Sequence, residues 1–280
     1  MILSFGPNGP DAAGIPLAVV LPSVVALVAY GTAAALAGRP GRAVRVPLLI
    51  GWVAHALAIG FDAASVGMPQ PGARFGFAPA LSVTSWLVLG VYLVESRFLP
   101  LIGVRRTLAV LGALAVLLAL AFPGESRPLV ASLWAPLHWV LGIASYGLFG
   151  AAVLHAVMLN RADRQMRGLR PGAPGSAGSG MPLLRLERLT FQFVAAGFIV
   201  LTIALLLGAW FATPWRWDHK TIFSLLGWCV FAGLLTGRRA FGWRGPQATR
   251  WLYAGAGLLL LAYVGSRFVM EVMLHRTAVA

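Results

Sequence analysis

The sequence predicts an all-α, polytopic membrane protein, a helix bundle with about eight transmembrane helices. Two observations predict this class. The 280 residues are 59% hydrophobic with a mean hydropathy of +0.82, and only 11% are charged, whereas a soluble domain has about 25% charged residues. The apolar residues also form runs that reach the length of about 20 residues needed for a helix to cross a bilayer.

Eight stretches meet this length. Residues 1–15 contain no lysine or arginine, so they lack the positive region of a signal peptide, and we expect the first run to be a retained helix. The fourth run begins next to Arg105 and Arg106. The fifth is longer than a bilayer requires, and we expect it to project into water. The predicted helices are 16–37, 46–67, 79–96, 106–122, 130–159, 189–211, 220–237 and 250–272.

The basic residues predict the orientation. Sixteen of the 22 lysines and arginines follow the first, third, fifth and seventh helices, and cytoplasmic loops are enriched in such residues. Both termini are therefore expected outside. The six on the outward side are Arg74, Arg127, Arg216, Lys220, Arg267 and Arg276. The sixteen on the cytoplasmic side are Arg39, Arg42, Arg45, Arg97, Arg105, Arg106, Arg161, Arg164, Arg167, Arg170, Arg185, Arg188, Arg238, Arg239, Arg244 and Arg250.

The chain is expected to form one integral-membrane domain in two parts. Residues 171–180 (PGAPGSAGSG) are a flexible linker within a cytoplasmic loop, 161–188. This loop separates a five-helix part, 1–160, from a three-helix part, 189–280. Because the arginines are topology determinants, the net charge of +14 does not indicate nucleic-acid binding. The single cysteine, Cys229, excludes disulfide chemistry by this chain alone.

The segment 214–220 (PWRWDHK) combines two tryptophans, a carboxylate, an imidazole and the chain's only lysine. It lies on the predicted outward face. This density of chemistry favours a binding platform for a large flat ligand, but Trp215 and Trp217 are also typical of the aromatic belt that anchors membrane helices. Asp218 suits the N-cap of a helix that His219 begins.

Three of the five histidines are expected on the outward face: His138 near the outer end of the fifth helix, His219, and His275 just past the eighth. His155 follows His138 by 17 residues, about 26 Å at about 1.5 Å per residue. We therefore expect it to be a surface residue near the cytoplasmic edge. His55, inside the second helix, has two interpretations: a hydrogen bond to a neighbouring helix or a role in a functional site.

Histidine is a common axial ligand of haem iron, and tryptophans offer the flat surface that a porphyrin needs. Two histidines on different helices beside an aromatic strip therefore suit a haem at the outer leaflet. Arg267, Glu271 and His275 are spaced to share one helix face. This spacing fits either a salt bridge that keeps the helix end polar or a Glu271 that orients His275.

The pattern Trp215-x-Trp217-Asp218-x-Lys220, followed by Trp228, resembles the WWD signature of the cytochrome c assembly family. This family includes the CcsA, CcmC and HemX branches of haem-handling membrane proteins, and the chain looks most like the YpjD-type inner-membrane branch. Trp134-x-x-x-His138, followed by Ser145-Tyr146, is similar to the family's outward-facing histidine helix. Other segments similar to the YpjD-type pattern are His55-Ala56-Leu57, Leu186-Glu187-Arg188, Gly242-Trp243-Arg244-Gly245 and Ala262-Tyr263-Val264-Gly265-Ser266-Arg267.

The resemblance implies non-covalent binding of haem b at the outer leaflet of the bacterial inner (plasma) membrane. By position, His138 matches the first axial histidine, and His275 lies where the second is expected. His219 is a rival second ligand. The residues implied to line the ring are Trp215, Trp217 and Asp218, and His55 is a further candidate. The implied partners are haem and apocytochrome c or other cytochrome assembly proteins.

Two departures from the family pattern narrow this expectation. CcsA-like chains carry Leu-His-x-Arg in the helix after the motif, where this chain has Leu235-Thr236-Gly237-Arg238, and Thr221 replaces the usual glutamate. We therefore expect a haem-binding assembly factor and not an enzyme. The alternatives are a non-enzymatic accessory or scaffold protein with a degenerate haem site, such as a transporter subunit, and a transporter in its own right. The absence of an internal repeat weakens the last alternative.

Overall fold

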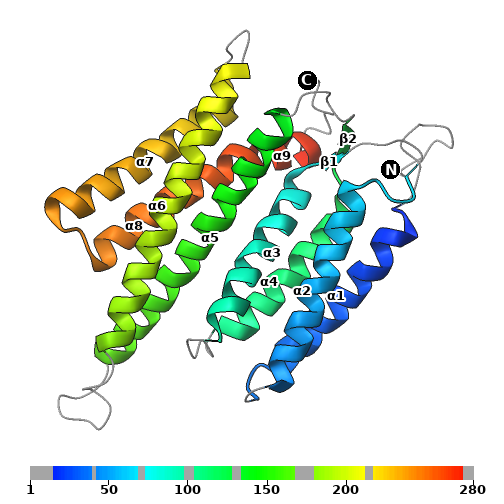
Figure 1. The fold of residues 1–280 in the computed structure, drawn as a ribbon, viewed down its shortest axis with the longest axis horizontal. Helices are drawn as coiled ribbons and strands as arrows, with labels where there is room; N and C mark the ends of the chain where they lie inside the picture. The colour runs from blue at the N-terminus through cyan, green and yellow to red at the C-terminus, as the bar shows by residue number, and fades with distance from the viewer. Residues whose placement is uncertain are drawn as a thin grey trace. The chain divides into compact units, whose positions relative to one another are not determined.

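The computed structural model describes residues 15–39, 42–68, 73–97, 104–127, 134–167, 180–211 and 217–273. The described residues are mostly helical (Figure 1). Within them, seven helices are long and apolar enough to cross a membrane, which confirms the predicted all-α membrane class. The long helices are α1 (Leu17–Ala35), α2 (Arg42–Ala63), α3 (Phe77–Glu95), α4 (Arg105–Ala121), α5 (Trp134–Arg167), α6 (Gly180–Phe211), α7 (His219–Phe241) and α8 (Gly245–Leu260).

Each of the eight predicted stretches coincides with a helix, but four of them differ in detail. Helix α5 runs to Arg167, eight residues past the predicted end, and α6 begins at Gly180, nine residues before the predicted start, so both described ends of the predicted loop 161–188 are helical. Helix α4 has 17 residues, fewer than the about 20 that cross a bilayer without distortion. The eighth span continues past α8 to Met273. It does so through a π-helical turn η2 (Leu261–Gly265), the short α9 (Ser266–Phe268) and a second π-helical turn η3 (Val269–Met273).

The chain divides into two compact units. The first comprises Met1–Ser82 and Arg105–Leu129, and in it α1 packs against α2 and α4. Small residues allow the close approach of α1 and α2, because a β-carbon at Gly51 would lie 2.6 Å from the Tyr30 ring. The buried alanines of α1 are Ala26, Ala29 and Ala33.

The same unit contains a pair of short strands that the sequence did not predict. Strand β1 (Ala73–Phe75) pairs antiparallel with β2 (Glu125–Arg127). Three residues are too few to show the alternation that identifies a strand. Arg74 Nη1 lies 3.5 Å from Asp62 Oδ1, so an ion pair ties β1 to α2. The paired strands carry Arg74 and Arg127, which the charge distribution assigns to the same side of the membrane.

The second unit comprises Val83–Val104 and Val130–Ala280. Here α5 packs along α6, α7 packs along α8, and α5 also contacts α8. In Figure 1, α5 and α6 are the long green and yellow helices. The Phe149 and Phe231 rings stack at 3.9 Å in the core between α5 and α7. Gly147 of α5 allows α3 to approach, because a β-carbon there would lie 2.7 Å from the Leu87 side chain.

The predicted linker, 171–180, lies outside the described residues except for its last residue, which begins α6. The predicted division at this linker and the outward orientation of both termini therefore stay predictions.

Candidate functional site

His138 lies in the second turn of α5 and is half-buried against α6. Its Nδ1 is 2.9 Å from the carbonyl oxygen of Ala204. A carbonyl only accepts hydrogen bonds, so Nδ1 must carry the proton, and in the neutral ring Nε2 then has the free lone pair. Among the described residues, no protein group bonds to this Nε2. His138 therefore has the tautomer and orientation of a metal-ligating histidine.

Gly208 makes room for this imidazole. It follows Ala204 by one helical turn on α6, and a β-carbon at this position would lie 2.8 Å from His138 Cε1 and 3.3 Å from Nδ1. Any other residue would push the ring away from the Ala204 carbonyl. The sequence analysis did not identify Gly208, because a glycine in an apolar helix has many structural explanations and its partner lies on another helix.

Lys220, the second residue of α7, interacts electrostatically with His138. The Lys220 ammonium is 5.7 Å from the centre of the Tyr263 ring in η2, a distance at which a cation–π interaction operates. Trp217, which directly precedes the cap of α7, is 69% exposed. Within the described part of the Trp-rich segment, Lys220 is thus the residue that acts electrostatically on His138. Trp215 and Arg216 lie outside the described residues.

Asp218 caps α7 as predicted. Its Oδ1 accepts a hydrogen bond from the backbone N–H of Thr221 at 2.7 Å. Partial burial alone would raise the pKa of the carboxyl group, but hydrogen bonds from Thr221 and the charges of Lys220 and His219 together lower it below its ordinary value. His219 is the first residue of α7 and is exposed. This geometry agrees with the interpretation of His219 as the residue that starts the helix.

Further down the second unit, two side-chain bonds fix the helices around the His138 region. The Tyr146 hydroxyl donates to the Leu259 carbonyl at 2.6 Å and joins α5 to α8. Trp228 Nε1 donates to Thr202 Oγ1 at 2.9 Å and joins α7 to α6. The Trp228 ring also stacks on Phe198, with ring centres 5.3 Å apart. Tyr146 and Trp228, which belong to the segments that resemble the family pattern, thus hold the scaffold together.

His55 belongs to a buried polar chain within the first unit. Its Nε2 lies 2.8 Å from Ser82 Oγ, and its Nδ1 lies 3.3 Å from the Tyr30 hydroxyl. All three residues are at most 4% exposed. Because both ring nitrogens have protein partners, this geometry favours the hydrogen-bonded interpretation of His55 over a role in ligand binding.

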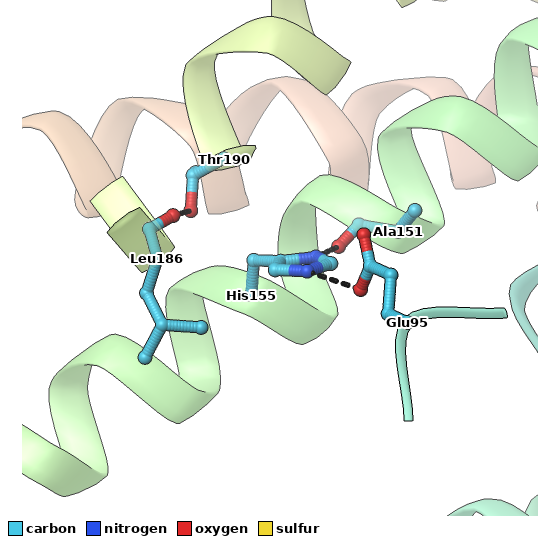
Figure 2. A network of polar contacts seen from close by, with 5 residues as sticks. All are labelled: Glu95, Ala151, His155, Leu186 and Thr190. Carbon is cyan, nitrogen blue, oxygen red and sulfur yellow. Dashed lines mark hydrogen bonds and ion pairs between the residues drawn. The ribbon is translucent and has the colours of Figure 1, made fainter. Parts of the chain in front are cut away.

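The structure corrects the prediction for His155, which is fully buried and not a surface residue. Figure 2 shows its ring between two acceptors: Nδ1 is 2.7 Å from the Ala151 carbonyl oxygen, and Nε2 is 2.7 Å from Glu95 Oε2. The Phe193 ring stacks on the imidazole at 5.2 Å. Residue spacing gave the height of His155 along α5, but it could not show that Glu95 and Phe193 face it from other helices.

The remaining sequence-predicted residues lie at the end of the last helix. Arg267 Nη1 is 3.8 Å from Glu271 Oε1, which agrees with the first of the two predicted alternatives, a salt bridge. His275 lies outside the described residues. No group of three or more potential metal-binding side chains occurs in the described part of the chain. A haem iron can be held by single histidine side chains from different helices, and the His138 imidazole would offer one such nitrogen.

The fold and the site define a multi-pass helical membrane protein that presents a histidine near the end of a spanning helix. The chain belongs to the cytochrome c assembly protein family, whose pattern matches residues 74–274. This match covers most of the second unit and part of the first, and it includes α3 to α8. The family contains inner-membrane relatives, and with its seven candidate spans the chain is a multi-pass protein of the inner membrane.

Three relatives illustrate the similarity. A cytochrome c biogenesis protein CcsA of Prochlorococcus marinus (strain MIT 9515) is 26% identical over 209 residues, 65% of this chain and 67% of the relative. The inner membrane protein YpjD of Escherichia coli (strain K12) is 30% identical over 139 residues, 49% and 52% of the two chains. A CcsA protein of Synechococcus sp. (strain JA-3-3Ab) is 32% identical over 117 residues, 37% and 34% of the two chains. The alignments thus span only 34% to 67% of the relatives' own lengths.

Proposed function

We propose that this protein binds haem b non-covalently at the outer leaflet and serves cytochrome c biogenesis. The hydrogen bond between His138 Nδ1 and the Ala204 carbonyl, at 2.9 Å, carries the proposal. It fixes the ring orientation and leaves Nε2 as the lone-pair donor, the state in which histidine binds iron. Family membership and relatives named as cytochrome c biogenesis proteins support the same function.

The other residues have complementary roles in this proposal. Gly208 leaves space for the His138 ring. The exposed Trp217 and its neighbour Trp215 supply aromatic surface for the porphyrin. His275 is the proposed second axial ligand, and His219 is its rival. Bound haem would supply an iron centre, to which one ring nitrogen of His138 and one of the second histidine would bind.

We infer that the protein holds haem and does not itself attach it. The chain lacks the Leu-His-x-Arg pattern of CcsA-like chains, since it has Leu235-Thr236-Gly237-Arg238 there, and Thr221 replaces the usual glutamate. Apocytochrome c or another assembly protein is therefore the proposed recipient. Lys220 lies within electrostatic range of His138, so the proposed iron ligand lies in the field of a positive charge.

Visible spectroscopy of the detergent-purified protein tests this proposal. We expect the oxidised and dithionite-reduced spectra to show a b-type haem with two histidine ligands, which acid–acetone extraction removes. His138→Ala should remove this signal. His275→Ala and His219→Ala, measured in parallel, identify the second ligand, because only loss of the true ligand changes the low-spin spectrum.

Circular dichroism and size-exclusion chromatography of each variant provide the control for folding. A wild-type protein that stays colourless after haem is added would refute the proposal and favour the accessory or scaffold function with a degenerate site. A folded His138→Ala variant with an unchanged spectrum would remove His138 from the site.

A further inference from the structure

The connection between α7 and α8 has a rigid geometry that the proposed haem site does not use. Two glycines with left-handed backbone geometry flank Trp243 and Arg244: Gly242 has φ +65° and Gly245 has φ +58°. Residues other than glycine rarely adopt this backbone conformation. The backbone N–H of Trp243 also donates a hydrogen bond to the Gly237 carbonyl at 3.3 Å. The backbone thus fixes the points from which the Trp243 and Arg244 side chains extend at this corner.

Three aromatic rings line this corner. The Trp243 ring lies over Gly237, where a β-carbon would collide with it. Its centre is 5.3 Å from that of Trp251 and 6.4 Å from that of Phe241. Phe241 is 76% exposed. Because α7 and α8 are both candidate membrane spans, these rings lie at a helix end, where aromatic side chains prefer the headgroup region of a bilayer.

The charges at the corner are mostly positive. Glu187 of α6 lies 3.8 Å from Arg238 and 3.7 Å from Arg244, so one carboxylate is shared by two guanidinium groups. Arg238 is further held over the Phe191 ring at 3.4 Å. The Arg244 side chain is 71% exposed, and Arg239, two residues before the end of α7, is exposed as well. The corner therefore presents an excess of positive charge to its surroundings.

We propose that this corner binds the phosphate headgroup of an acidic phospholipid. We call the site the headgroup corner and define it by Arg239, Phe241, Trp243, Arg244 and Trp251. Guanidinium groups match the geometry of phosphate oxygens, and the rings suit the depth at which a headgroup lies. The predicted orientation places the corner on the cytoplasmic side, where basic residues beside a span attract anionic lipids.

This inference is independent of haem binding. The headgroup corner belongs to the ends of α7 and α8 that are joined to each other, whereas His138 lies near the start of α5 and is close to the other end of α7, at Lys220. His138→Ala should therefore leave lipid binding unchanged, and loss of the headgroup corner should leave the haem spectrum unchanged.

Native mass spectrometry of the full-length protein in detergent tests the proposal, with phosphatidylglycerol and phosphatidylcholine as probes. We expect phosphatidylglycerol to bind at least about tenfold more tightly than phosphatidylcholine, in line with the strong contribution of charge-assisted contacts. The double variant Arg239→Ala/Arg244→Ala should lose most of this preference. Arg105→Ala/Arg106→Ala, which removes two arginines of the same predicted side from the other unit, is the matched control and should keep it.

Three results would overturn the proposal: equal binding of the two lipids, a folded double variant with an unchanged preference, or displacement of phosphatidylglycerol by millimolar inorganic phosphate. The last result would identify a site for free phosphate. Equal binding would leave a protein partner as the occupant of the corner. If the double variant does not fold, Arg239→Gln alone replaces it, because Arg239 is exposed, and the same preference is measured.

Discussion

The two histidines of α5 both place Nδ1 against a backbone carbonyl, yet their second ring nitrogens meet different surroundings. His138 bonds to Ala204 on a neighbouring helix at 2.9 Å, and its Nε2 has no protein partner among the described residues. His155 bonds to Ala151 of its own helix, and its Nε2 lies 2.7 Å from Glu95. The partner of the second nitrogen therefore separates a candidate ligand from a structural residue.

The Glu95 carboxylate gives the largest expected effect. Glu95→Ala leaves the buried His155 Nε2 without its acceptor, and breaking a buried pair in this way costs about 3–5 kcal/mol. Glu95→Gln, which keeps a hydrogen-bonding side chain, should lose less. The free energy of unfolding in mixed micelles titrated with dodecyl sulfate measures the difference. If Glu95→Ala kept its stability but lost haem, the pair of Glu95 and His155 would belong to the haem site.

A substitution at Gly208 should disturb the position of the His138 ring without changing a proposed ligand. Gly208→Ala places a methyl group 2.8 Å from the present position of His138 Cε1, and overpacking of this kind costs about 1–3 kcal/mol. We expect the ring to move, the Ala204 bond to break and haem absorbance to fall. Gly142→Ala on α5 is the matched control, because its β-carbon would meet nothing within 4 Å. Equal haem content in both variants would contradict this account.

Substitutions at Asp218 test how much the N-cap of α7 contributes to the stability of the protein. Asp218→Ala removes an N-cap and should cost about 1 kcal/mol, whereas Asp218→Asn keeps the cap. Because the pKa of Asp218 is lowered, its ionised form contributes stability above the ordinary carboxyl pKa. This contribution disappears as the pH falls through the lowered value. Comparing unfolding of the wild type and Asp218→Asn at acidic and neutral pH measures it, and identical pH profiles would refute it.

Tyr30 extends the comparison to a third histidine, with the smallest expected effect. Tyr30→Phe removes the hydroxyl 3.3 Å from His55 Nδ1, and a long bond of this type contributes about 0.5–1 kcal/mol. The haem spectrum should not change, because His55 uses both ring nitrogens within its own unit. A change in the haem spectrum of Tyr30→Phe would indicate that His55 is a haem ligand after all.

The helices were predictable to within a few residues at most ends, because the thickness of a bilayer imposes a length on every apolar run. The N-cap at Asp218 was predictable for a similar reason, since capping depends on residues adjacent in the chain. The short strands β1 and β2 were not, because their pairing joins segments about 50 residues apart and three residues carry no periodic pattern.

The site was only partly predictable. His138 could be singled out as a candidate ligand, since histidine is rare in apolar helices and its spacing from Trp134 resembles a known family pattern, and its role as a ligand stays a prediction. Gly208 could not be found, because its role depends on which helix face meets His138. The prediction for His155 was wrong for the same physical reason: the sequence contained Glu95, but only the packing of α3 and α5 shows that the two side chains meet. Trp215 and His275 remain predictions.

The short connection between α7 and α8 also has a consequence for how the protein assembles. Only residues 242–244 separate the two helices, and the entropy lost on closing a loop rises with its length. The contacts between α7 and α8 are therefore local in the chain, and local contacts form quickly. We expect these helices to enter the membrane and pair as a hairpin soon after synthesis, so that the pair docks on α5 and α6 as a preformed element.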